Sequence, residues 1–405
     1  MVAFHFPPAA MSSGHLRTLG FARYLPKLGW DPIVLTARAI AYPRTAPIPS
    51  GSIPDGCAIH RALALDARRH FGIAGKYPGF LAVPDRWSSW WPFAVWQGWR
   101  LIRRYRVQAI WSTYPIMTAH CVAYSLHRIT GLPWIADFRD PVEKPTHMAN
   151  GPSAVSQLRR ESKIVQAASR NVFTTPSALR DYAVRYPDLY AEQKLLLIEN
   201  GYDEREFANL PTPAERQPGR PLVLLHSGLL YASGRNPVPF LTALAQLRAS
   251  KTIDNVNVIF RASQSEKDYA RDVQRLGLGK VVTFLPQISY RDALIEQMTA
   301  DGLLLFQGPQ FDRQVPAKLY EYLRVGRPIF ALTGDQGDTA NVLRNTGGAE
   351  IAPIDDVEAI ASRLATFIQA LQNGRAPVSH PAAVARYSRQ KGAVLLAEQF
   401  DQIIR

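Results

Sequence analysis

The chain has 405 residues, of which 47% are hydrophobic and 20% are charged, as in an ordinary globular protein. At roughly 100–200 residues per domain, this length predicts two domains, each able to bury a core. No window offers the ~20 apolar residues of a membrane-spanning helix, and the opening MVAFHFPPAA lacks the basic region of a signal peptide. Cys57 and Cys121 form neither a metal motif nor a disulfide framework, which favours a reducing cytoplasm.

The net charge of +14 is unevenly distributed along the chain. Residues 1–210 carry 25 Lys+Arg against 15 Asp+Glu, or +10, and residues 211–405 carry 22 against 18, or +4. A basic surface of this kind suits an anionic membrane face or nucleic acid. Because no nucleic-acid-binding motif is recognisable, we expect no nucleic acid partner.

In the first half of the chain, short apolar runs alternate with helical patterns. We expect strands at 2–6, 32–36, 107–113, 133–138, 171–175 and 194–200, and helices near 14–28, 92–106, 116–130 and from Pro176 onward. The first strand is short, which favours a natural start upstream of Met1. Residues 39–90 read as a long irregular region rich in Pro and Gly, either functional or locally disordered.

The second half repeats this alternation. We expect strands at 221–228, 255–262, 281–286, 302–307 and 328–333. Short strands separated by helices predict an α/β fold with two doubly wound, Rossmann-like domains built on parallel sheets. The Pro-rich stretch 209–221 reads as the linker, so the expected domains are 1–208 and 209–387, with a C-terminal helix, 388–405, packing back on the first.

The stretch VPAKLYEYLRVGRPIF (315–330) predicts a short helix with Pro316 in its first turn and Gly326 just past its end. It carries Lys318 near its N-terminus, where the macrodipole disfavours positive charge. One interpretation is a solvated pair between Lys318 and Glu321, three residues apart. The other is a phosphate held jointly by the lysine and the helix N-terminus.

Four segments, in this order, resemble the GT-B glycosyltransferases, and within that fold the family 4 retaining enzymes of bacterial polysaccharide synthesis. They are FPPAAMSSGHLRTLGFARYLPKLGWDPIVLT (6–36), LPWIADFRDPVEK (132–144), IENGYDEREF (198–207) and VPAKLYEYLRVGRPIF (315–330). The resemblance implies two Rossmann-like domains facing a central cleft. It also implies retaining, metal-independent transfer of a hexose from a UDP- or GDP-linked donor, with no cofactor.

The resemblance also implies where the donor binds. Glu321 would bind the ribose hydroxyls, and Lys318, with Arg235, would neutralise the diphosphate and stabilise the leaving group. Arg261, Leu319 and Gly14 complete the expected donor site; the competing interpretations are loop arginines and a plain turn glycine. The family's first helix glutamate is replaced by Arg313, with Asp312 beside it, which puts donor-sugar recognition in question.

On the acceptor side, the resemblance points to the strand end ADFRDP. Asp137 or Asp140 would orient or deprotonate the acceptor hydroxyl; alternatively, both pair with Arg139 as a structural cluster. His15 ranks above His5 and His226 as a histidine near the cleft. No histidine pair has zinc-ligand spacing, so no metal site is expected.

The segment 86–106 holds five of the eight tryptophans, followed by several arginines. Aromatic and basic side chains together are typical of an interfacial membrane contact, here through Trp90, Trp91, Arg103 and Arg104. The alternative is a helix packed into the core through Trp96 and Trp99. With a lipid-linked or polysaccharide-precursor acceptor, the first interpretation implies a cytoplasmic enzyme peripheral on the inner membrane.

Two other functions fit the same features. One is a GT-B-fold epimerase that acts on a nucleotide sugar without an acceptor. The other is a non-catalytic member that binds nucleotide sugar or polysaccharide, which Arg313 makes credible.

Overall fold

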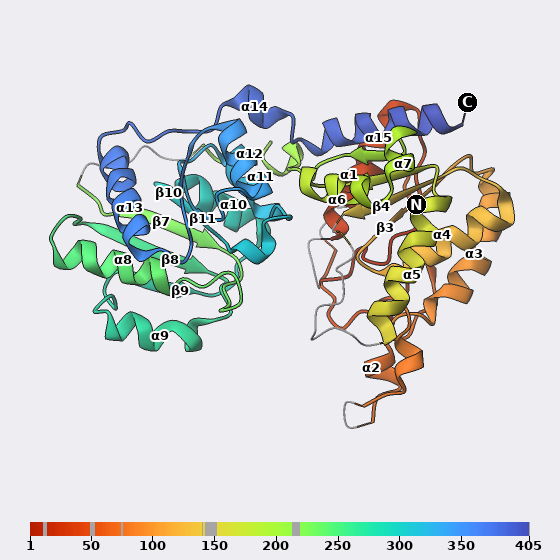
Figure 1. Cartoon of the computed structure of the whole chain (residues 1–405), viewed down its shortest axis with the longest axis horizontal. Coiled ribbons are helices and arrows are strands. Elements are labelled where there is room, and N and C mark those ends of the chain that lie inside the picture. The colour runs from red at the N-terminus through yellow and green to blue at the C-terminus, as the bar shows by residue number, and fades with distance from the viewer. Residues whose placement is uncertain are drawn as a thin grey trace. The chain divides into compact units, whose positions relative to one another are not determined.

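The computed structural model describes residues 1–10, 14–48, 53–73, 76–139, 141, 152–212 and 219–404. The chain divides into two compact units: unit 1 is Met1–Asn200 with Arg389–Arg405, and unit 2 is Gly201–Ser388 (Figure 1). The expected division stood at residues 208 and 209. Each unit is an α/β layer structure with helices on both faces of a parallel sheet.

Unit 1 is built on short parallel strands. They are β1 (Ile33–Ala37), β2 (Ala58–Ala62), β3 (Ile110–Thr113), β4 (Trp134–Arg139), β5 (Arg170–Phe173) and β6 (Leu195–Leu197). The strand expected at 2–6 is a single parallel bridge at Val2, which joins Leu35 of β1 to Ser112 of β3. The order across unit 1 is therefore β2, β1, Val2, β3, β4, β5, β6.

Helices cover both faces of this sheet. They are α1 (His15–Tyr24), α2 (Ala67–His70), α3 (Trp90–Tyr105), α4 (Met117–Thr130), α5 (Pro152–Ala167), α6 (Pro176–Arg185), α7 (Pro187–Ala191) and α15 (Arg389–Ile403). Buried side chains of α3 to α6 form one core, and those of α1 and α15 form another on the opposite face. Trp30 donates to Asp401 at 3.0 Å, so the C-terminal helix is also tied to unit 1 by a hydrogen bond.

Unit 2 has one six-stranded parallel sheet in the order β12-β11-β10-β7-β8-β9. Its strands are β7 (Leu222–Ser227), β8 (Val256–Arg261), β9 (Val282–Leu285), β10 (Gly302–Gln307), β11 (Ile329–Thr333) and β12 (Ala349–Ala352). Its helices are α8 (Val238–Ala249), α9 (Glu266–Arg275), α10 (Tyr290–Thr299), α11 (Ala317–Val325), α12 (Asp338–Thr346), α13 (Val357–Gln372) and α14 (Pro381–Ala385). Helices α8 and α13 pack on one face, and α10, α11 and α12 on the other (Figure 1).

The region expected to be irregular, 39–90, contains the edge strand β2 and the short helix α2. Strand β12 was also not expected from the sequence. No helix among the described residues is long and apolar enough to cross a bilayer.

Helix α3 approaches α4 and the sheet closely because it has a glycine at the contact. A Cβ at Gly98 would lie 2.7 Å from Leu126 Cδ1 and 3.2 Å from Leu35 Cδ2. Gly98→Val is therefore expected to lower the free energy of unfolding by about 1–3 kcal/mol through overpacking, measured by urea denaturation. Gly79→Ala is the control, since a Cβ there meets no atom within 4 Å. An unchanged midpoint for Gly98→Val would contradict the close packing.

Candidate functional site

The order of strands in unit 2 places a topological switch point at the carboxyl edge of its sheet. β7 and β10 are neighbours, yet the chain leaves β7 toward α8 on one face and β10 toward α11 on the other. In sheets of this kind, ligands bind where neighbouring strands send the chain in opposite directions. Strands β7 and β10 end at this edge, with His226 and Gln307 among their last residues.

Lys318, in the first turn of α11, lies at this switch point, next to His226 of β7. Its Nζ is 3.4 Å from His226 Nε2, and His226 Nδ1 lies 2.9 Å from the carbonyl of Leu304. An Nδ1–H that donates to Leu304 leaves Nε2 as an acceptor for the lysine. A Cβ at Gly228 (φ +126°) would lie 2.3 Å from Nζ, so the lysine packs directly on backbone that only glycine suits.

The lysine is a cation held in a desolvated place. Burial, and secondly the charge of Arg235, lower the pKa of Lys318 to about 7, while Glu321 opposes this shift. Burial, followed by Lys318, lowers the pKa of His226 well below its usual range. A bound anion would relieve this unfavourable state because it favours the charged form of the lysine.

Arg235 supplies a second positive charge. Its guanidinium donates to Gln307 Oε1 at 3.2 Å and lies over the rings of Tyr231 (5.4 Å) and Phe311 (5.9 Å). Its Nε is buried with no hydrogen-bond partner among the described residues. The loops that follow β7 and β10 meet here, because Gly308 N–H donates to Gly234 O at 2.7 Å. Lys318, Arg235 and the N-terminus of α11 are the kinds of group that bind anions.

The remaining residues of the expected donor site differ in burial and in the partners of their side chains. Glu321 is half-buried and accepts from Tyr290 Oη at 2.8 Å. Arg261 was expected to be free for a phosphate, but it is paired with Glu296 at 2.6 Å and donates to Pro286 O. Leu319 is fully buried in the core, so its side chain does not reach a ligand.

Arg313 and Asp312 stand where the resemblance leads us to expect the first glutamate, and the structure describes both. Arg313 is exposed. The Asp312 side chain turns toward a glycine loop, where a Cβ on Gly334 or Gly337 would lie 2.4 or 2.7 Å from its Oδ1. Burial, and secondly the charge of Asp338, raise the pKa of Asp312. The carboxyl group at position 312 therefore packs against the loop that precedes α12, and not against α11.

In unit 1, Asp137 is held in an ion pair with Arg17, and not in the expected cluster with Arg139. Its Oδ2 and Oδ1 accept from Arg17 Nε (2.8 Å) and Nη2 (3.0 Å), and Oδ2 also accepts from Thr113 at 3.2 Å. The aspartate is completely buried, and Arg17 is 7% exposed. Asp140, the other expected base, lies outside the described residues.

Arg139, His15 and Gly14 do come together at the carboxyl edge of the unit 1 sheet. The register between β4 and β5 shifts between Asp137 and Arg139, where φ is +38°, and such irregularities re-aim side chains. The Arg139 guanidinium donates to Gly14 O at 3.2 Å. Burial and then the charges of Arg139 and His15 lower the pKa of His5 to about 4. Gly14 itself is helical (φ −56°), so its position does not require glycine.

Helix α3 places its tryptophans opposite to the sequence expectation. Trp90 is completely buried in the core, and Trp91 is half-buried and donates to Ser125 at 3.0 Å, so Trp90 is excluded from a membrane contact. Trp96 and Trp99 are 59% and 37% exposed. Arg103 and Arg104 are exposed, as a surface contact requires.

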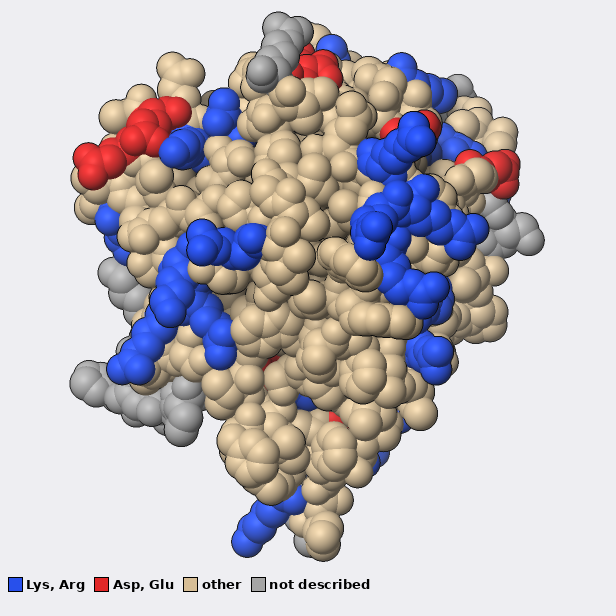
Figure 2. Space-filling view, turned by 90° about the vertical axis from the view of Figure 1, so that its right-hand side faces the viewer, with Lys and Arg blue, Asp and Glu red and all other residues tan. Residues whose placement is uncertain are grey.

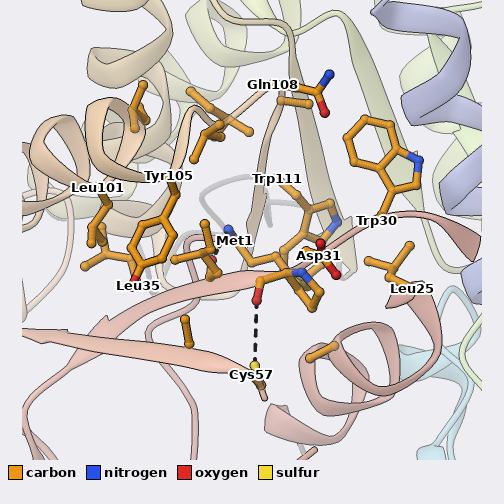
Figure 3. Close-up of a pocket in the computed structure, with 18 of the residues that line it drawn as sticks. Met1, Leu25, Trp30, Asp31, Leu35, Cys57, Leu101, Tyr105, Gln108 and Trp111 are labelled. Atoms are coloured by element: carbon orange, nitrogen blue, oxygen red, sulfur yellow. Dashed lines mark hydrogen bonds between the residues drawn. The ribbon is translucent and has the colours of Figure 1, made fainter. Parts of the chain in front are cut away.

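An apolar cavity of about 520 Å³ lies at the amino edge of the unit 1 sheet, opposite to the edge that holds His15 and Arg139 (Figure 3). Trp30, Trp111, Tyr105 and Leu101 line it, and Cys57 Sγ donates to Pro32 O at 3.8 Å. Because ligands in doubly wound sheets bind at the carboxyl ends of the strands, this cavity is not the donor site.

Sequence reasoning undervalued His226 and missed Gln307 and Gly228. The signal was a polar side chain one or two residues before a glycine at two strand ends, LLHSG and LLFQG. Among the described residues, no cluster of three or more His, Cys, Asp or Glu side chains could hold a metal ion.

The ion pair of Arg17 and Asp137 can be tested by stability. Asp137→Asn keeps the shape but leaves the buried guanidinium without its counter-charge, which is expected to cost about 3–5 kcal/mol of unfolding free energy. Urea denaturation measures it, with the exposed Asp31→Asn as the control. If Asp137→Asn unfolded like wild type and lost only activity, the general-base interpretation would be restored.

No protein-family model matches the sequence, and no curated protein matches it. Solved structures do. Sucrose-phosphate synthase from Thermosynechococcus elongatus is 15% identical, with TM-score 0.64 over 97% of this chain and 94% of that one. HepE from Anabaena, in complex with UDP and glucose, is 16% identical, with TM-score 0.63 over 99% and 100%. WaaG, a glycosyltransferase involved in lipopolysaccharide biosynthesis, is 14% identical, with TM-score 0.60 over 99% of both chains. The predicted fold class is confirmed: the chain has the GT-B fold, with a Rossmann-like parallel sheet in each unit.

Proposed function

We propose that this protein is a retaining glycosyltransferase that moves a hexose from a nucleotide-diphospho-sugar to a membrane-associated glycolipid or polysaccharide-precursor acceptor. The observation that carries the proposal is the pair of Lys318 and Arg235, converging on the carboxyl edge of β7 and β10. Two positive charges at a strand switch point match the two phosphates of a nucleoside diphosphate.

The chemistry assigned to these residues follows from their geometry. Departure of a nucleoside diphosphate leaves negative charge on its phosphates, and preorganised positive charge stabilises that charge as it develops. Glu321, three residues after Lys318 on the same helix, offers carboxylate oxygens to the ribose hydroxyls. None of these roles requires a bound metal or a cofactor.

The similar structures support a nucleotide-sugar donor. HepE was crystallised with UDP and glucose and with UDP-glucose, and this chain matches both forms over 99% of its length. A UDP-linked donor is therefore our first choice, and a GDP-linked donor is the second.

The acceptor side rests on unit 1. Arg139 and His15 lie beside Gly14 and His5 at the edge where an acceptor would bind in this fold. Their basic character suits an acceptor that carries phosphate, such as a lipid-linked sugar. A cytoplasmic protein peripheral on the inner membrane would meet such an acceptor.

Donor binding tests the proposal directly. Calorimetric titration with UDP, GDP, ADP and CMP is expected to give micromolar affinity for one diphosphate. Lys318→Ala is expected to weaken it at least tenfold, about 1.4 kcal/mol, while Lys267→Ala, on the exposed side of α9, leaves it unchanged. Equal binding by wild type and Lys318→Ala would refute the assignment of α11. Conversion of a nucleotide sugar into its epimer without any acceptor would favour the epimerase alternative.

The lowered pKa of Lys318 predicts a pH dependence. In the free protein the lysine loses its proton as pH rises through about 7, and bound diphosphate raises this pKa. Binding therefore takes up a proton, and affinity should be highest below pH 7 and fall up to about tenfold per unit between pH 7 and 9. Calorimetry in two buffers of different ionisation enthalpy measures the proton uptake. Lys318→Arg, which stays charged, should abolish the slope; a slope that persists in this variant would assign it to another group.

A further inference from the structure

Helix α3 turns an aromatic and basic face to solvent. Its buried side is formed by Trp90, Ala94, Gly98 and Leu101. On the other side, Phe93, Trp96 and Trp99 are 46%, 59% and 37% exposed. Three large rings on one outer helix face are more apolar surface than a water-facing helix ordinarily carries.

A groove of about 580 Å³ runs beside this face. It lies between α3 and the first unit's edge strand β2, and is lined by Arg38, His60, Arg61, Trp96, Gln97, Trp99, Arg100, Leu101, Arg103 and Arg104. None of these described lining residues is acidic. Arg38, Arg100, Arg103 and Arg104 are exposed and make no ion pair with any described residue. The groove therefore presents positive charge that the described part of the chain leaves without a counter-charge.

The aromatic and basic groups are coupled to each other. The Arg100 guanidinium lies 4.8 Å from the ring centre of Trp96, and that of Arg103 lies 5.0 Å from Trp99. Figure 2 views the molecule from the side on which α3 and α4 are drawn in Figure 1, and Lys and Arg gather there in two groups with uncharged surface between them. Each indole is thus held beside a charge, as at the boundary between lipid head groups and acyl chains.

Lipid and nucleic acid both offer phosphates, but the geometry favours lipid. A nucleic acid base would stack on the face of an indole, and one face of Trp96 and one of Trp99 are already covered by guanidinium groups. Phe93, on the same side, has no polar group that could contact a phosphate. Apolar rings interleaved with arginines fit an interfacial helix that lies in the plane of a bilayer.

We propose that the outer face of α3, with the adjoining arginine groove, docks on an anionic membrane through the phosphates of its lipid head groups. This inference deepens the proposed function and rests on it for the membrane-bound acceptor. The docking itself needs only the arginines and rings of α3 and is measured without donor or acceptor.

Co-sedimentation with vesicles tests the docking. Full-length protein is expected to sediment with phosphatidylcholine vesicles that contain phosphatidylglycerol and to stay in the supernatant with vesicles of pure phosphatidylcholine. High salt should abolish the binding. Arg100→Gln/Arg103→Gln/Arg104→Gln should weaken partitioning about a hundredfold, since each basic group near an anionic leaflet contributes roughly fivefold. The matched control is Lys267→Gln/Arg271→Gln/Lys280→Gln, three exposed basic residues of unit 2. Equal loss in both triple variants, or no preference for anionic vesicles, would overturn the proposal.

The aromatic contribution has its own readout. Vesicles with brominated acyl chains should quench the fluorescence of membrane-bound protein, and Trp96→Phe should remove part of this quenching while binding persists. Quenching unchanged in Trp96→Phe would contradict the insertion of this face. Tighter, salt-sensitive binding to an RNA or DNA oligonucleotide than to anionic vesicles would replace the membrane with nucleic acid.

The outcomes separate this proposal from the proposed function. The α3 triple variant should bind the nucleoside diphosphate as wild type does, which also shows that it is folded. Vesicle binding without any nucleotide binding would support the docking surface and refute the proposed glycosyltransferase function. Nucleotide binding without vesicle binding would support the proposed function and refute the docking surface.

Discussion

Parallel pairing of β7 with β10 is the constraint on which the candidate site depends. The pairing sets Leu224 against Gly302 and Leu225 against Leu303, so that both strands end at the same edge. Gly302 is needed there, because a Cβ would lie 2.9 Å from Leu224 Cδ2. With the strands in this register, His226 reaches the first turn of α11, and Lys318 loses part of its hydration without gaining hydrogen-bond contact with a carboxylate among the described residues. A desolvated cation of this kind is poorly stabilised in the absence of an anion, so it favours anion binding. The cation of a structural ion pair is already stabilised by its partner and does not.

The buried cation of unit 1, Arg17, is stabilised by partners within the chain. Arg17 is satisfied by Asp137 and by the carbonyl groups of Ile198 and Glu199, so α1, β4 and the end of the unit are joined at one guanidinium. Removing both charges from water is expensive, and good geometry with additional hydrogen bonds is what makes such a pair tolerable. The register shift between β4 and β5 lies directly after this pair, between Asp137 and Arg139.

The sequence predicted most strands of both units because apolar runs of β-branched and aliphatic residues are strong local signals. It missed β2, AIHRA, whose residues are mostly half-buried and include a histidine and an arginine. It also misjudged side-chain direction. Leu319, Trp90 and Arg261 lie in the helices and strands that the sequence predicted for them. Whether their side chains are buried, as for Leu319 and Trp90, or paired, as for Arg261 with Glu296, depends on neighbours far along the chain. Lys318 was accessible to sequence reasoning because a lysine in the first turn of a helix is locally unfavourable and therefore informative, whereas Arg235 was expected from the family resemblance.

The two groups of unneutralised cations differ in a way that bears on what each binds. Lys318 and Arg235 are constrained by Gly228, His226 and Gln307, so their charges have one arrangement and suit a ligand of defined shape. The arginines of α3 are exposed and long, and two of them rest on indole rings rather than on hydrogen-bond partners. Such charges adapt to phosphates whose positions vary, at the cost of strong dependence on salt. Desolvated charge in one arrangement selects one molecule, whereas exposed charge recognises a surface. The difference in burial between Lys318 and the α3 arginines is therefore the physical reason to assign a nucleotide to the first group and a membrane to the second.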